Sequence, residues 1–143
     1  MKNLVVLPGL RGLSDAAFFV LRLLVGAFLM WGTWDNITSA ERMQEFVAFL
    51  TALQCPMPEI AAPISVSAQF LSGALILVGL LTRWAGLVMA FNFIVAIALL
   101  TFGGGESDFR ALFPPLIMIA VPLVLATHGP GAFAIDALLT RSK

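Results

Sequence analysis

The sequence predicts an all-α membrane protein: an antiparallel four-helix transmembrane bundle with a short amphipathic surface helix between spans one and two. Apolar side chains make up 60% of the 143 residues, and charged ones only 11%. The mean hydropathy is +1.00. The apolar residues are also gathered into four long runs. A soluble domain of this size cannot cover so much apolar surface, so we expect one bilayer-embedded domain covering residues 1–143.

The four predicted spans are residues 16–34, 60–81, 84–102 and 111–127. Each is close to the roughly 20 residues that a helix needs to cross the hydrocarbon core. Helices are required there because lipid offers an open backbone no hydrogen-bond partner. Only Thr82 and Arg83 separate the second span from the third, so these two spans form an antiparallel hairpin.

The basic residues outside the spans fall mostly on one side of the predicted bundle. The side of the termini has Lys2, Arg11, Arg83, Arg141 and Lys143, and the other side has Arg42 and Arg110. The positive-inside rule therefore places both termini in the cytoplasm, in a plasma (inner) membrane of the bacterial type. A cleaved signal peptide is the alternative for the first span. Arg22 argues against it because the charge interrupts the apolar core that such a peptide needs.

The segment between the first two spans has a helical pattern of its own. Thr38 and Glu41 are spaced as a capping box, and Pro56 ends the pattern. Apolar residues then recur at helical spacing: Met43, Phe46, Val47, Leu50 and Leu53. This pattern predicts an amphipathic helix over about residues 39–53, either resting on the outer membrane surface or covering the mouth of the bundle.

Charge and composition exclude several functions. Eight basic residues balance eight acidic ones, so no basic field is available for nucleic acid. The single cysteine, Cys55, and the single histidine, His128, cannot form an internal disulfide, a metal-ligand set or a pair of haem ligands. We therefore expect no metal site and no intrinsic cofactor, so a redox centre would have to come from a partner or a diffusible molecule.

Three polar side chains within the spans are the main candidates for a site. Arg22, Gln69 and Asn92 lie at similar depths, so we expect them to converge in the bundle interior, where polar groups cost less together. Arg22 either pairs structurally, snorkels to the headgroups or contacts a substrate. Ser65 lies on the same helical face as Gln69. This polar set is either hydrogen-bonding glue between helices or the lining of a ligand pocket.

Three parts of the sequence form a recognisable pattern: residues 68–83 (AQFLSGALILVGLLTR), Arg22 with two later glycines in the first span, and residues 129–136 (GPGAFAID). In these parts the chain resembles the DoxX family of small four-span membrane proteins. The resemblance extends over about residues 17–139. It implies a four-helix membrane bundle with a link to redox chemistry. Some relatives are subunits of a thiosulfate:quinone oxidoreductase, and others associate with superoxide dismutase and a sulfurtransferase.

The chain departs from the family pattern in two places. Asp35 and Asn36 stand where the family usually has lysine, and Gln69 stands where it usually has glutamate. Because an amide does not titrate, a proton-transferring role for the glutamate cannot be carried over to Gln69.

The resemblance favours a small membrane subunit of a quinone-linked redox system, docked to a soluble or membrane redox enzyme and not catalytic alone. The available hydrogen-bond donors for a quinone are Arg22, Trp31, Trp34, Gln69 and Asn92. No catalytic residue is assigned. The alternative is a non-catalytic assembly or interaction protein, including a homo-oligomer, whose function lies in its helix surface. A small-solute transporter has less support, because no inverted repeat is visible and the spans hold one charge.

Overall fold

The computed structural model describes residues 7–105 and 108–141, which form helices and no strands. Four of these helices are long and apolar enough to cross a membrane, as predicted: α2 (Ser14–Thr38), α4 (Pro58–Val78), α5 (Thr82–Phe102) and α6 (Phe109–His128). The short helix α3 (Ala40–Ala52) lies between α2 and α4 in the chain. A 3-10 helix, η1 (Pro8–Leu13), precedes α2, and α7 (Ile135–Arg141) follows α6. The predicted fold class is confirmed.

The predicted capping box is wrong by one residue. Helix α2 continues to Thr38, whose Oγ1 donates to the carbonyl of Trp34 at 2.9 Å. The N-cap of α3 is Ser39, which alone has the extended backbone (φ −127°, ψ 118°) that a cap requires. Its Oγ accepts a hydrogen bond from the backbone N–H of Arg42 at 3.4 Å. No capping box can close here, because the residue three positions after Ser39 is arginine and not glutamate or glutamine.

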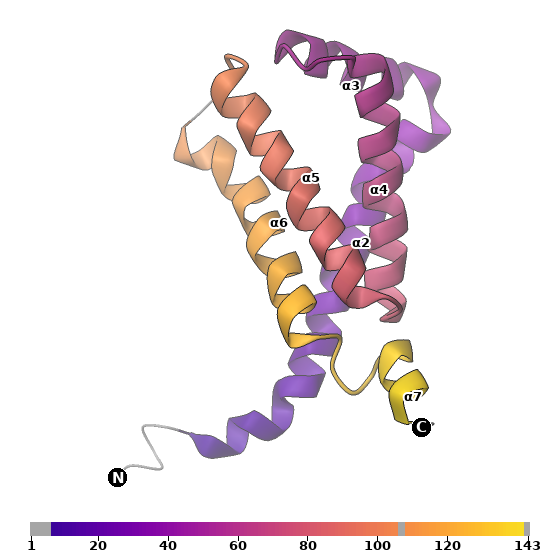
Figure 1. The fold of residues 1–143 in the computed structure, drawn as a ribbon, viewed down its shortest axis with the longest axis vertical. Coiled ribbons are helices and arrows are strands. Elements are labelled where there is room, and N and C mark those ends of the chain that lie inside the picture. The colour runs from indigo at the N-terminus through magenta and orange to yellow at the C-terminus, as the bar shows by residue number, and fades with distance from the viewer. Residues whose placement is uncertain (1–6, 106–107, 142–143) are drawn as a thin grey trace.

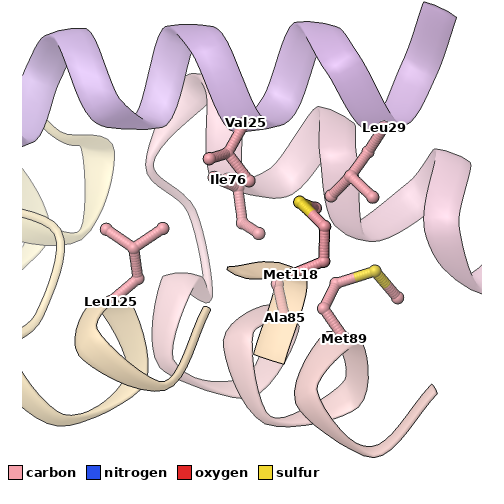
Figure 2. Packing of buried hydrophobic residues seen from close by; sticks show 7 residues of the cluster. All are labelled: Val25, Leu29, Ile76, Ala85, Met89, Met118 and Leu125. Carbon is pink, nitrogen blue, oxygen red and sulfur yellow. The ribbon is translucent and has the colours of Figure 1, made fainter. Parts of the chain in front are cut away.

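The four long helices form two antiparallel pairs, α2 with α4 and α5 with α6, and contacts between α4 and α5 join the pairs (Figure 1). Glycine allows close approach within each pair. A Cβ added to Gly26 would lie 2.7 Å from the carbonyl oxygen of Gly73, and one added to Gly86 would lie 2.5 Å from that of Pro122. All four helices supply the buried core (Figure 2), which contains Val25, Leu29, Ile76, Ala85, Met89, Met118 and Leu125.

The two ends of the bundle differ in construction. The described terminal elements, η1 and α7, lie at one end, called here the terminal end, and α3 lies across the opposite end, called the α3 end (Figure 1). The amphipathic prediction for α3 is confirmed. Leu50 and Leu53 are buried against the bundle, whereas Glu41 and Glu45 are exposed. Which end faces the cytoplasm stays a prediction from the basic residues.

Candidate ligand-binding site

A cavity of about 450 Å³ lies among α3, α4 and α5, toward the α3 end of the bundle. The α3 residues Phe46, Phe49 and Leu50 contribute to its lining. The walls on α4 and α5 are mostly aliphatic or aromatic. Among the described residues that line the cavity, none is Asp, Glu, Lys, Arg or His. The cavity is therefore apolar and uncharged, which suits a lipophilic molecule with a neutral polar group.

The polar lining groups form a chain of hydrogen bonds across the α4–α5 contact. Gln69 Nε2 donates to Ser65 Oγ at 3.1 Å, and Ser65 Oγ donates to Asn92 Oδ1 at 2.9 Å. Ser65 and Gln69 share a face of α4 because they are four residues apart, and Asn92 meets them from α5. We call these three side chains the amide relay. The relay joins two spans and also borders the cavity, so it is placed both to hold helices together and to contact a ligand.

Arg22 does not belong to this cluster, so the prediction that it converges with Gln69 and Asn92 is wrong. Its side chain is 1% exposed and turns toward the terminal end. Nη1 donates to the carbonyl oxygen of Pro130 at 3.1 Å, and Nη2 donates to that of Phe133 at 2.6 Å. These carbonyls lie in the loop after α6, where no helical N–H is available to them. Arg22 therefore pairs structurally, which was one of its three predicted roles.

The two tryptophans of α2 do not line the cavity either. Trp31 is 85% exposed and Trp34 is 55% exposed, so both face the surroundings of the bundle. The Trp34 ring packs against Phe70, with ring centroids 6.1 Å apart. Of the five predicted donors, the structure brings Gln69 and Asn92 together at the cavity and places Arg22, Trp31 and Trp34 elsewhere.

Two residues contribute more to the cavity than the sequence predicted. Ser65 was assigned to the polar face of the second span, but its position as the central member of the relay follows only from the packing of α4 against α5. Phe49 lies outside the predicted apolar set of α3 and nevertheless lines the cavity. Its spacing of three residues from Phe46 was the available signal, because residues three apart share a helix face.

The terminal end is closed by side chains that bind the backbone of neighbouring segments. The Asp136 carboxylate accepts hydrogen bonds from the N–H groups of Leu81 at 2.8 Å and Thr82 at 2.9 Å, which are free because they begin α5. Arg83 Nη1 donates to the carbonyls of Ala126 and Thr127, both at 2.7 Å, at the end of α6. These contacts hold the end of α6 and the start of α7 against the start of α5.

Comparison with known proteins places this architecture in a family. The family model of DoxX matches residues 17–103, which is more than half of the chain. The chain belongs to the DoxX family. Over 133 residues it is 27% identical to "Inner membrane protein YqjF" of Escherichia coli (strain K12), with 92% of this chain and 98% of the relative covered. No solved structure matches the chain.

The DoxX match contains the whole cavity. All lining residues, from Phe46 to Leu99, fall between residues 17 and 103, as does Arg22. Residues 129–136, part of the original resemblance to DoxX, lie beyond the matched range. They nevertheless hold the partners of Arg22 and the Asp136 carboxylate. In this member of the DoxX family the matched range therefore depends on the C-terminal segment for the pairing of its buried arginine.

Proposed function

We propose that this DoxX protein is a ligand-binding membrane subunit of a quinone-linked redox system, and that its α3–α4–α5 cavity holds the head of a quinone-class molecule. The observation that carries the proposal is the neutral amide relay on the wall of an otherwise apolar cavity. A quinone requires this combination, because its ring is apolar and its carbonyls accept hydrogen bonds. The volume, about 450 Å³, also falls among those of small-molecule sites.

The cavity favours access from the bilayer. Ile64 on α4 and Phe91 on α5 line it and are 63% and 69% exposed, so its rim is apolar at the level of the spans. An alkyl tail can leave between such residues without losing its apolar surroundings. The absence of charged groups from the described lining disfavours a phospholipid headgroup, which would be desolvated without a counter-charge.

We further propose that oxidation and reduction occur in a partner enzyme. The relay contains only amides and a hydroxyl, which do not exchange protons readily near neutral pH, so the cavity offers binding without acid–base catalysis. The name of the Escherichia coli relative supports an inner-membrane location. Purification in mild detergent tests the partnership: a co-purifying oxidoreductase supports it, whereas a stoichiometric non-redox partner without quinone favours an assembly protein.

Cys55 allows a direct binding test, because it lines the cavity and is the only cysteine. The protein in quinone-free phosphatidylcholine nanodiscs is titrated with a fully ring-substituted benzoquinone, which cannot add a thiol at an open ring position. The labelling rate of Cys55 by a maleimide is then measured. We expect saturable protection, weakened about fivefold by Gln69→Leu, since one hydrogen bond contributes about 1 kcal/mol. Gln44→Leu, on the exposed face of α3, is the matched control. Absence of saturable protection would refute quinone binding in this cavity.

A further inference from the structure

We infer that the amide relay is reversible, and that the cavity therefore binds the oxidised and reduced forms of its ligand with similar affinity. The inference rests on the proposed quinone site and concerns how that site discriminates between redox forms. It begins with Ser65, whose hydroxyl has one proton and so donates to only one neighbour at a time. In the structure Ser65 accepts from Gln69 and donates to Asn92.

Each of the two amides has one polar atom that takes no part in the relay. Gln69 uses Nε2 and Asn92 uses Oδ1, which leaves Gln69 Oε1 and Asn92 Nδ2 without a partner among the described residues. Neither atom is sealed in the protein. The buried side-chain nitrogen and oxygen atoms that lack a partner in the described part of the chain are Arg22 Nε and Thr82 Oγ1. Both amide residues of the relay line the cavity, so one free acceptor and one free donor are accessible there.

The direction of the relay can be inverted without moving its backbone. Rotating both amides by half a turn and turning the Ser65 hydroxyl gives Asn92 Nδ2 donating to Ser65 and Ser65 donating to Gln69 Oε1. Amide oxygen and nitrogen have nearly the same size and geometry, so the heavy atoms keep their positions. After inversion Gln69 presents its amino group and Asn92 presents its oxygen. Each position can therefore offer either a donor or an acceptor.

A reversible relay matches the chemistry of a quinone couple. An oxidised quinone carbonyl only accepts hydrogen bonds, whereas a hydroquinone hydroxyl donates one as well. A free donor can bind the carbonyl of the quinone or the hydroxyl oxygen of the hydroquinone, whereas a site with acceptors alone would favour the hydroquinone. Because the relay presents one free donor in either direction and the direction can be exchanged, both forms keep a hydrogen bond from the relay, whichever amide lies nearer their ring oxygen. The site is thus suited to exchanging the two forms with a partner enzyme instead of retaining one of them.

The test compares the two redox forms in the nanodisc assay of Cys55 protection. A fully ring-substituted benzoquinone and its hydroquinone, kept reduced under anaerobic conditions, are titrated separately. We expect dissociation constants within about threefold of each other, equivalent to a shift of about 14 mV in the midpoint potential of the bound couple. A wild-type preference above about tenfold for either form would overturn the inference while leaving the quinone site intact. Failure of both forms to bind would reject the proposed site itself, and the inference with it.

The second part of the test uses variants in which the direction of the relay hydrogen bonds is fixed. Asn92→Asp, measured at pH 8, replaces an amide that can donate with a carboxylate that only accepts, so Ser65 must donate toward position 92. Both free ends then become acceptors. We expect this variant to prefer the hydroquinone by about tenfold or more. Gln69→Glu fixes the relay in the opposite direction and also leaves two free acceptors, so we expect the same preference for the hydroquinone. This variant replaces Asn92→Asp if the latter does not fold. Gln44→Glu adds the same charge on the exposed face of α3 and should leave the ratio unchanged. If a folded locked variant keeps the wild-type ratio, the relay does not set the preference.

Discussion

The Arg22 guanidinium, inside the first span, donates to the carbonyl of Phe133 at 2.6 Å across 111 residues of sequence. Its other terminal nitrogen reaches Pro130, and the guanidinium carbon lies 5.8 Å from the centroid of the Phe19 ring. A buried charge is thus balanced by two loop carbonyls and an aromatic face. This pairing makes the terminal end of the bundle sensitive to substitution in ways that the cavity is not.

Replacing Arg22 with lysine is expected to lower the free energy of unfolding by about 1–3 kcal/mol. A single ammonium cannot reproduce the planar fork that reaches both carbonyls, and it leaves a charge-assisted hydrogen bond unmade. Thermal unfolding in detergent checks this, with Arg42→Lys as the control because Arg42 lies on the exposed surface of α3. Cys55 protection by quinone should survive in the folded fraction. Loss of binding without loss of stability would mean that Arg22 acts on the cavity.

Gly79→Ala should destabilise the protein through two separable effects. Gly79 has φ +74°, where a Cβ costs about 1–2 kcal/mol. That Cβ would also collide with Arg22 Nη1 and lie 2.6 Å from the Ala134 Cβ. Gly104→Ala isolates the first effect, because Gly104 has φ +84° with no atom near the added Cβ. Gly32→Ala, on α2, is the control for both effects, because no atom lies near the added Cβ and the backbone there has no positive φ. We expect the unfolding temperature to fall most for Gly79→Ala, less for Gly104→Ala and hardly at all for Gly32→Ala. Equal decreases for Gly79→Ala and Gly104→Ala would rule out a collision of the added Cβ with Arg22.

Asp136→Ala is expected to free the C-terminal segment and to cost about 0.5–2 kcal/mol, the usual range for losing a helix N-cap. The carboxylate serves two N–H groups at the start of α5, so Asp136→Asn, with one carbonyl oxygen, should recover part of the loss. Limited proteolysis after α6 provides the measurement, compared with unfolding of the whole bundle. Asp108→Ala is an informative control, because Asp108 caps α6 at the opposite end. Equal cleavage of wild type and Asp136→Ala would show that the cap does not hold this segment.

The orientation in the membrane can be tested with single cysteines in a Cys55→Ser background. In intact cells, a membrane-impermeant maleimide should label Glu45→Cys on the exposed face of α3 and spare Thr140→Cys in α7. Leu50→Cys should resist labelling because residue 50 lies on the buried face of α3. Labelling at 140 instead of 45 would invert the topology that the basic residues predict.

The sequence was sufficient for the spans, because a run of apolar side chains at bilayer length has few alternatives. Helix ends were less predictable. Helix α2 continues to Thr38, past the apolar run that ended at residue 34, since backbone hydrogen bonds extend a helix beyond its apolar part. The amphipathic pattern correctly predicted α3, but it did not reveal which span-facing residues form the cavity lining.

The pairing of the polar groups depended on geometry that a single sequence does not contain. Equal depth suggested that Arg22 would meet Gln69 and Asn92, yet depth does not determine which way a helix face turns. The partners of Arg22 are backbone carbonyls, which any residue type can supply and which leave no signal in the sequence. Ser65 and Gln69 were recognisable as one face of a helix, whereas the crossing to Asn92 required the contact between α4 and α5.

The long separation between Arg22 and its acceptors sets an order of events during synthesis. Arg22 leaves the ribosome 108 residues before Pro130 and 111 before Phe133. Until those carbonyls arrive, the first span carries an unpaired charge, which the bilayer disfavours. The terminal end of the bundle therefore closes only after residue 133 has been synthesised. A chain truncated before Pro130 lacks both acceptors, so we expect its first span to keep an unpaired charge.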